Sequence, residues 1–172
     1  KSKSSGKSSS KSSTNSKSSP GAEPKAAAFP PGTFSWIELG TTDATAAKKF
    51  YGELIGWTFA DSPMPQGGVY TMVQLGGKDV GGLYKLENRP GVPPHWLSYV
   101  AVRDASLAAK KAVECGGKIL QDAFDVMDAG RMAVLEDPSG AVFAVWQAKN
   151  HAGAGVAGNR IGDRIAVAVV GS

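Results

Sequence analysis

The chain has 172 residues, is 42% hydrophobic and carries a formal net charge of +4, which suits one globular domain with a buried core. No apolar run approaches the roughly 20 residues that span a bilayer, and a single cysteine, Cys115, excludes an intrachain disulfide and is typical of a cytoplasmic protein. The positive charge belongs to residues 1–28, because the rest of the chain holds 13 basic and 14 acidic residues and lacks the basic excess of a nucleic-acid-binding domain.

The two ends of the chain differ in composition from its centre. Residues 1–31 are rich in serine and lysine and cannot bury enough apolar surface to offset the entropy lost on ordering. We predict a disordered tail or a non-native extension, with at most weak contacts to nucleic acid. Residues 149–172 form a Gly/Ala-rich extension, whose apolar run within 161–170 is an edge strand, a partner contact or a non-native addition.

Between residues 32 and 88, the hydrophobic pattern predicts a strand, a helix and three further strands. Asp43 is a suitable N-cap for the helix, and Gly56 is a suitable stop. The helical spacing places Ala47, Phe50, Tyr51 and Leu54 on one face. The expected elements are a strand over 34–39, a helix over 44–54 and strands over 57–60, 69–75 and 80–86.

The same order of elements repeats between residues 93 and 148. Asp43 and Asp104, the two predicted N-caps, are 61 residues apart, and the helix-ending Gly56 and Gly117 have the same offset. The expected elements are a strand over 96–102, a helix over 104–114 and strands over 119–127, 132–136 and 141–146. A constant offset indicates tandem copies of one βαβββ module, here 32–88 and 93–148, within one α+β domain over 32–148.

Three motifs resemble landmarks of the vicinal oxygen chelate superfamily, which includes glyoxalases, bleomycin-resistance proteins and dioxygenases. They are the segment Glu38-Leu-Gly-Thr-Thr-Asp43, the pattern Phe50-Tyr-x-x-x-x-Gly-Trp57 and the turn Glu136-Asp-Pro-Ser-Gly140. The chain is most similar to single-domain bacterial members, many of which have no established reaction. The resemblance implies two tandem βαβββ modules whose mixed sheet curls around a cleft, and it is compatible with a homodimer.

The resemblance also locates the positions that hold a metal in metal-dependent members. In these members each module supplies one ligand from its first strand and one from its last, and the divalent ion acts as a Lewis acid. The corresponding positions in this sequence are Trp36, Leu83, Leu97 and Ala144. None of these side chains ligates a metal ion, so we expect neither a metal nor another cofactor in this cleft.

Strand alternation around these positions predicts what lines the cleft instead. If Trp36 and Leu97 face inward, Glu38 and Tyr99 point the same way, and these two residues are again 61 apart. The residues expected to line the cleft are Trp36, Glu38, Leu83, His95, Leu97, Tyr99, Ala144 and Trp146. Apolar walls with a few polar groups predict a site for a small aromatic or amphipathic molecule.

Two other hypotheses remain open for the same residues. In the first, the protein is an enzyme of a lyase, isomerase or hydroxylase-like kind, with Glu38 and Tyr99 as acid–base groups or with an atypical metal site. In the second, Glu38 and Tyr99 form a hydrogen bond to each other and the cleft is filled by side chains.

Overall fold

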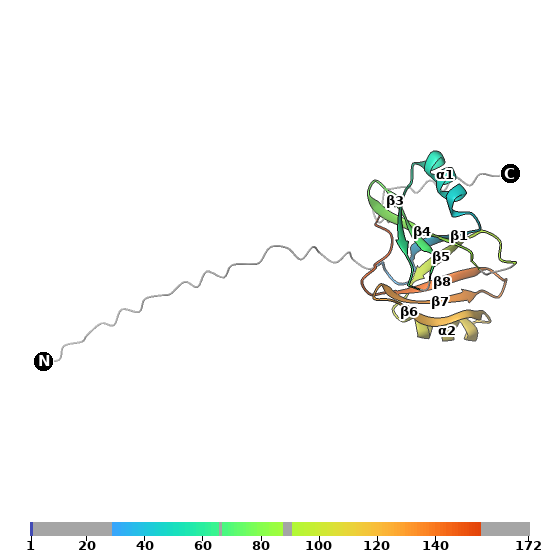
Figure 1. Ribbon diagram of the computed structural model, residues 1–172. Coiled ribbons are helices and arrows are strands. Elements are labelled where there is room, and N and C mark those ends of the chain that lie inside the picture. The colour runs from blue at the N-terminus through green and yellow to red at the C-terminus, as the bar shows by residue number, and fades with distance from the viewer. Residues whose placement is uncertain (2–28, 66, 88–90, 156–172) are drawn as a thin grey trace.

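The computed structural model describes residues 1, 29–65, 67–87 and 91–155 (Figure 1). Residues 2–28 of the expected tail and the apolar run within 161–170 lie outside these ranges. The helices and strands are β1 (Phe34–Thr41), α1 (Ala44–Ile55), β2 (Thr58–Pro63), β3 (Val69–Leu75), β4 (Lys78–Lys85), β5 (His95–Ala101), α2 (Ala105–Glu114), β6 (Lys118–Val126), β7 (Gly130–Glu136) and β8 (Val142–Ala148).

Both helices begin at the aspartates that the sequence predicts. The Asp43 carboxylate accepts a hydrogen bond from the Ala46 backbone N–H at 2.9 Å, and Asp104 accepts one from Leu107 at 2.9 Å. Each bond satisfies a backbone donor that has no partner within the first helical turn. At the other end of α1, Gly56 adopts the left-handed conformation, with φ of 72°, and stops the helix.

The strands form one open mixed sheet in the order β2-β3-β4-β1-β5-β8-β7-β6. Within each module the first and last strands pair in parallel, β1 with β4 and β5 with β8. The modules join through the antiparallel pair β1–β5, where Ile37 lies opposite Ser98. The two βαβββ halves are therefore related by a pseudo-twofold axis at this pair, as the repeat predicts for an α+β fold.

The two faces of the sheet pack against different parts of the chain. The outer face carries both helices, which lie at opposite ends of the molecule (Figure 1). Under α1, the buried residues Leu39, Val73 and Leu83 contact Ala47 and Tyr51. Under α2, a second cluster comprises Ala105, Ala109, Ala133, Leu135 and Val145. The opposite side, here called the inner face, carries a third cluster, made of Trp36, Leu97, Tyr99, Met132, Ala144 and Trp146.

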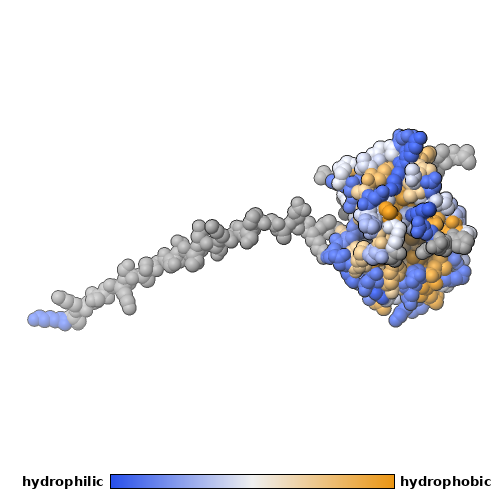
Figure 2. Space-filling model, in the orientation of Figure 1, coloured by the Kyte–Doolittle hydropathy of each residue, from blue (hydrophilic) through white to orange (hydrophobic). Residues whose placement is uncertain are grey.

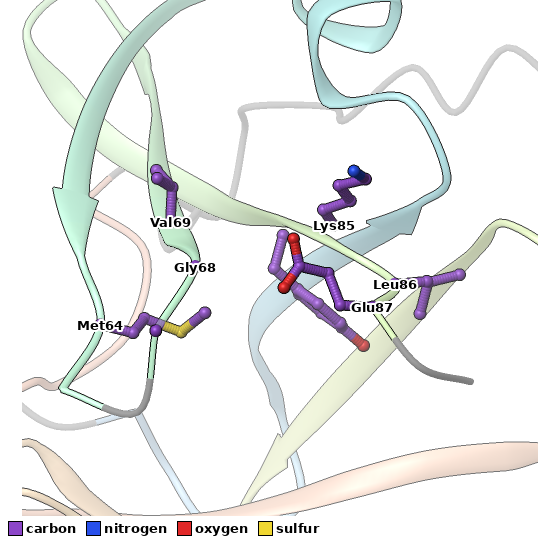
Figure 3. Close-up of a pocket in the computed structure, with 8 residues that line it drawn as sticks. Met64, Gly68, Val69, Lys85, Leu86 and Glu87 are labelled. Atoms are coloured by element: carbon purple, nitrogen blue, oxygen red, sulfur yellow. The ribbon is translucent and has the colours of Figure 1, made fainter.

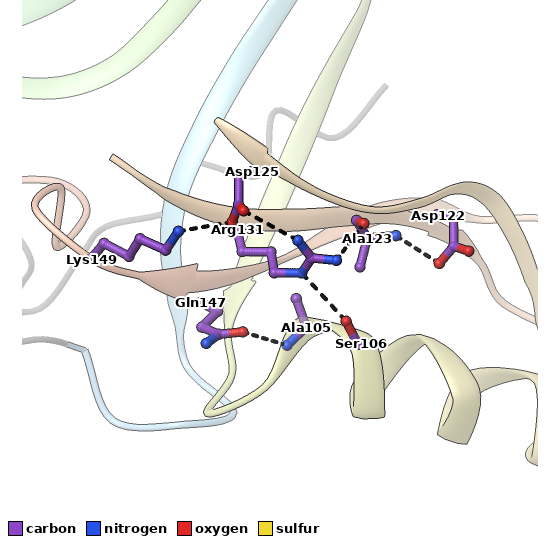
Figure 4. Close-up of polar contacts among 8 residues, drawn as sticks. All are labelled: Ala105, Ser106, Asp122, Ala123, Asp125, Arg131, Gln147 and Lys149. Atoms are coloured by element: carbon purple, nitrogen blue, oxygen red, sulfur yellow. Dashed lines mark hydrogen bonds and ion pairs between the residues drawn. The ribbon is translucent and has the colours of Figure 1, made fainter. Parts of the chain in front are cut away.

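Helix α2 is tied to its strands by polar contacts as well as by alanines. The Arg131 guanidinium donates to the Ala123 carbonyl at 2.7 Å and to the Ser106 hydroxyl at 3.3 Å. The Gln147 side chain accepts from the Ala105 backbone N–H at 3.0 Å (Figure 4). These contacts link the start of α2 to β6, β7 and β8.

Helix α1 is less deeply packed than the sequence predicts. Ala47 and Tyr51 face the sheet, but Phe50 and Leu54 are 57% and 62% exposed. The apolar face that the sequence predicts for α1 is wider than the part of the sheet that it covers. Phe50 and Leu54, at one side of this face, therefore remain exposed to solvent. In Figure 2 hydrophobic and hydrophilic residues are interspersed over the folded part. No helix in the described ranges is long and apolar enough to cross a membrane.

Candidate ligand-binding site

The centre of the inner face is a carboxylate held by two tyrosines. Glu38 on β1 accepts a hydrogen bond from the Tyr70 hydroxyl at 2.6 Å and one from the Tyr99 hydroxyl at 2.6 Å, one at each oxygen. The Trp36 indole N–H donates to the Tyr70 oxygen at 3.2 Å and extends the network. Strands β1, β3 and β5 thus place four side chains in one continuous hydrogen-bonded group.

Burial sets the ionisation of this group. It raises the pKa of the Glu38 carboxyl, although the hydrogen bonds from Tyr70, Tyr99 and Trp36 oppose the rise by stabilising the anion. Burial and the neighbouring Glu38 charge also raise the pKa of both tyrosines. Both phenols therefore remain protonated hydrogen-bond donors at neutral pH, and Glu38 is the titrating member of the group.

A glycine makes room for this arrangement. Gly82 on β4 is the register partner of Glu38. A Cβ atom at Gly82 would overlap the hydroxyl of Tyr70, and would lie 2.6 Å from the ring carbon that bears it. Tyr70 reaches Glu38 because position 82 has no side chain. Tyr70 was not predicted as a site residue, because its reach depends on a glycine of another strand.

The prediction that Leu83 lies on the inner face is wrong. Leu83 packs with Leu39 and Val73 beneath α1, on the outer face. The reason is a local offset between the modules. Tyr99 pairs with Ala144 in module two, whereas its counterpart Glu38 pairs with Gly82 in module one. These positions are 62 residues apart instead of 61, so Gly82 is the inner-face counterpart of Ala144.

The inner face does not fit the divalent metal that the sequence resemblance implies for metal-dependent members. The equivalent positions around the pseudo-twofold axis are Trp36, Gly82, Leu97 and Ala144, and none offers an oxygen, sulfur or imidazole ligand. Among the residues that the structure describes, no three or more His, Cys, Asp or Glu side chains group as ligands would.

Side chains fill the space between the modules. Trp36, Leu97, Tyr99, Ala144 and Trp146, all expected to line an open cleft, are at most 7% exposed. Residues 149–155 add cover, and His151 places its ring edge-on to Trp36, with ring centroids 4.7 Å apart. His151 itself is half-buried, and burial lowers its pKa. The sequence has no periodicity here that would reveal the contact.

An open pocket of about 250 Å³ lies where β4 ends and β3 begins. Figure 3 shows the Glu87 carboxylate and the Met64 thioether at its rim. Tyr84 pairs in register with Tyr70, so the pocket adjoins the hydrogen-bonded group around Glu38. The lining residues are Met64, Gly67, Gly68, Val69, Tyr84, Lys85, Leu86 and Glu87. None was predicted from the sequence.

One predicted site residue, His95, lies beside two residues that line this pocket. A Cβ atom built at Gly40 would meet side-chain atoms of His95, Tyr84 and Leu86, each within 3.2 Å, so these three side chains converge beside β1. The His95 Nδ1 atom lies 2.9 Å from the Pro93 carbonyl oxygen. Glu38, Tyr99 and Trp36 form the floor of the inner face, while His95 stands at its edge.

Comparison with known families matches this chain over most of its folded part. The sequence profile of the Glyoxalase/Bleomycin resistance protein/Dioxygenase superfamily matches residues 33–145. A Mycobacterium tuberculosis protein named "Putative glyoxylase CFP32" is 45% identical over 134 residues, which are 76% of this chain and 51% of that protein. The "Anthracycline biosynthesis protein DauV" of a Streptomyces species is 37% identical over 143 residues, 76% of this chain and 52% of that protein.

The chain thus spans about half the length of these curated relatives. Among solved structures, the hypothetical protein BH1468 from Bacillus halodurans is similar, with a TM-score of 0.52 and 15% sequence identity. The alignment covers 67% of this chain and 93% of that protein. At that identity the likeness supports the fold alone.

Proposed function

This chain belongs to the glyoxalase, bleomycin-resistance and dioxygenase superfamily, and we propose that it binds a small aromatic or amphipathic molecule in the pocket beside Tyr84. The observation that carries the proposal is the chemistry of the pocket lining. Met64, Val69 and Leu86 supply apolar walls, and Tyr84 and Glu87 supply placed polar groups. Concave sites of this composition are typical of small-molecule ligands.

The pocket replaces the location that the sequence predicts for the ligand. The space between the modules is filled by Trp36, Tyr99 and Trp146, whereas the pocket is open and adjoins the same inner face. Its lining residue Tyr84 is the register partner of Tyr70, which donates a hydrogen bond to Glu38, so the pocket lies near a polar group of defined geometry. We propose that this group orients a hydroxyl or amino substituent of the ligand.

The relatives support the class of ligand. The Streptomyces protein is named for anthracycline biosynthesis, and anthracyclines are flat aromatic molecules. An aromatic ligand fits a pocket bounded by a tyrosine ring and a thioether, which is a favourable neighbour of aromatic rings. Because this chain spans only about half of that protein, the name of the relative supports the class of ligand alone and not an activity of this chain.

An enzyme is the second candidate, and the raised pKa of Glu38 favours it. Shifted carboxyl pKa values cluster at catalytic sites. In this case Glu38 and Tyr99 would be the acid–base groups of a lyase, isomerase or hydroxylase-like reaction. The geometry favours binding over catalysis, since each Glu38 oxygen already accepts a buried hydroxyl group. Turnover of a bound compound that stops in Glu38→Gln would favour the enzyme.

Two further expectations complete the proposal. The exposed thiol of Cys115 suits a reducing compartment such as the cytoplasm. A homodimer agrees with the exposed apolar flank of α1, formed by Phe50, Leu54 and Ile55, because such flanks are often covered by a partner.

A ligand screen with two matched variants tests the proposal. Planar aromatic and amphipathic compounds are screened for thermal stabilisation of the full chain. Leu86→Ala removes apolar pocket surface and is expected to weaken the binding of a hit about tenfold, which corresponds to the burial of about two methylene groups. Leu107→Ala removes an equal side chain that is 63% exposed on α2 and leaves binding unchanged. The proposal would be refuted if no compound stabilises the chain, or if Leu86→Ala does not weaken the binding of the compounds that do.

A further inference from the structure

The pocket of the proposed function lies within module one, because every residue that lines it belongs to residues 32–88. The turn between β2 and β3 supplies one wall, with Met64 and Gly68, and the end of β4 and the segment after it supply the other, with Leu86 and Glu87 (Figure 3). The Leu86 backbone N–H donates to the Thr41 carbonyl at 2.7 Å. A backbone hydrogen bond thus holds the second wall against the end of β1.

Glu87 faces the pocket because a tight turn follows β4. In a continued strand, Lys85 and Glu87 would point to the same face of the sheet. The Glu87 backbone N–H instead donates to the Lys85 carbonyl at 2.9 Å, which closes a three-residue turn. Figure 3 shows the Glu87 carboxylate directed over the pocket, while the Lys85 side chain extends away from it. The turn therefore brings an anion to the pocket and separates it from the cation two residues before it.

The Glu87 carboxylate approaches the opposite wall at Gly68. A Cβ atom built at Gly68 would lie 3.7 Å from Oε2 of Glu87 and 3.3 Å from the methyl carbon of Met64. The carboxylate and the thioether therefore flank the same point, and that point is open because position 68 has no side chain. A small group that enters there meets a negative charge and a polarisable sulfur-containing side chain together.

None of the side chains in the described ranges neutralises Glu87. The residue is exposed, and it takes part in none of the ion pairs between described residues. The nearby Glu38 does not offer its carboxylate in this way, because each of its oxygens already accepts a tyrosine hydroxyl group at 2.6 Å. Glu87 is therefore the anion that a ligand in this pocket contacts.

The other polar groups at the pocket also suit a positively charged partner. The pocket is lined by Tyr84, and the face of a tyrosine ring attracts a cation. His95, whose ring lies beside Tyr84 and Leu86, has its Nδ1 atom 2.9 Å from the Pro93 carbonyl oxygen. Because a carbonyl oxygen only accepts, we assign the proton of the neutral ring to Nδ1, which leaves Nε2 as an acceptor. The pocket edge thus offers acceptors and an aromatic ring.

We propose that the ligand of this pocket is a cation, namely an aromatic or amphipathic molecule with a protonated amino group that the Glu87 carboxylate binds. This inference rests on the proposed function, because it names the charge of the molecule that occupies the same pocket. The apolar part of the ligand lies against Val69 and Leu86, and the ammonium group lies between Glu87 and the ring of Tyr84. An ammonium group donates to a carboxylate more strongly than a neutral hydroxyl group does.

Three naphthalene probes with one ring system separate the effect of charge from that of apolar contact. They are naphthylmethylamine, a cation at neutral pH, naphthylmethanol, which is uncharged, and naphthoate, an anion, each substituted at the same ring position. Their binding to the full chain is measured by isothermal titration calorimetry. We expect the amine to bind about tenfold more tightly than the alcohol, and the carboxylate to bind least. The advantage of the amine is expected to shrink as sodium chloride is added, because salt screens an exposed ion pair.

Two substitutions at the pocket are expected to act in opposite directions. Glu87→Gln keeps the size of the side chain, removes its charge, and is expected to abolish the advantage of the amine over the alcohol. Lys85→Met removes a neighbouring positive charge and is expected to tighten binding of the amine about twofold. Both residues are exposed, so both variants are expected to keep the unfolding temperature of the unaltered chain. Glu53→Gln removes an equal charge from the exposed surface of α1 and is the matched control, with all three affinities unchanged.

The results distinguish failure of this inference from failure of the pocket. Equal affinity for the amine and the alcohol, or an advantage of the amine that survives Glu87→Gln, would overturn the inference, although weaker binding of all three probes to Leu86→Ala would still support the pocket. Tightest binding of naphthoate would also overturn it and would assign recognition to Lys85. Affinities that Leu86→Ala leaves unchanged, or no binding of any probe, would overturn both proposals.

Discussion

Glu38 and Tyr99 occupy equivalent positions in the two modules and join across the pseudo-twofold axis by a 2.6 Å hydrogen bond. They are not directly opposite each other, since Trp36 faces Tyr99 and Glu38 faces Leu97 in the β1–β5 register. Within these two facing pairs, Glu38 and Tyr99 are diagonal neighbours. The repeated fold thus places an acceptor and a donor at matching positions, so that each module completes the polar group of the other.

Removal of the Tyr99 hydroxyl is expected to destabilise the fold. Tyr99→Phe leaves one buried Glu38 oxygen without its donor, and we expect a loss of about 1–3 kcal/mol in the free energy of unfolding, measured with urea. Tyr51→Phe, on the side of α1 that packs against the sheet, is the control and is expected to change the free energy of unfolding by less than about 0.5 kcal/mol. Equal effects of the two substitutions would contradict the role given to the Tyr99 hydroxyl.

The pH dependence of stability is expected to reveal Glu38. Its pKa in the folded protein lies above the ordinary value of 4.5 because of burial, so the folded state binds the proton more tightly than the unfolded chain does. The resulting contribution to stability is complete below the ordinary pKa and is lost as pH rises through the folded pKa.

The comparison with Glu38→Gln isolates this contribution from the other carboxyls. Asp61 and Asp137 have lowered pKa values and act in the opposite sense, but they are common to both proteins. We expect the unaltered chain to lose stability relative to Glu38→Gln as the pH is raised from about 4 to neutrality. A difference that stays constant, or that grows in the other direction, would show that Glu38 is not desolvated.

The sequence predicted the order of the helices and strands well, because the patterns that indicate them are local or repeated. Asp43 and Asp104 are caps that act within one helical turn, and an offset of 61 predicted both the order of the modules and the equivalence of Glu38 and Tyr99. The offset failed at β4, where one residue of difference moved Leu83 to the outer face. Side-chain direction in a strand reverses with each residue, so a slip of one is sufficient.

The rest of the site depends on contacts that no local pattern encodes. Tyr70 reaches Glu38 because Gly82, on a different strand, leaves a gap. His151 reaches Trp36 because residues 149–155 lie against both modules, with Gly153 in close approach to the Ser35 carbonyl. Both contacts join side chains that are far apart in the sequence, so they become visible only in the folded chain.

The space at Gly82 can be tested by filling it. Gly82→Ala forces the Tyr70 ring away from Glu38 and is expected to cost about 1–3 kcal/mol of stability through overpacking. Gly52→Ala is the matched glycine substitution on α1, where a Cβ atom meets its nearest neighbour at 3.4 Å. In a helix interior that change is expected to raise stability by about 0.5–1 kcal/mol. The two substitutions are therefore expected to change the free energy of unfolding, measured with urea, in opposite directions. No loss of stability in Gly82→Ala would show that Tyr70 does not depend on the missing side chain at position 82.

Residues 149–155 are expected to loosen from the inner face as the pH falls. Burial against Trp36 and Trp146 lowers the pKa of His151, while the Asp79 carboxylate on β4 partly offsets this. A histidine with a lowered pKa stabilises the closed arrangement above its ordinary value of 6.5, and this contribution is lost as protonation proceeds at lower pH. We therefore expect acrylamide quenching of tryptophan fluorescence to increase from pH 7.5 to pH 5. His151→Phe keeps an aromatic ring that cannot titrate, so its quenching should stay flat over this range, while His95→Ala should follow the unaltered chain. The same increase in His151→Phe would assign the change to another group.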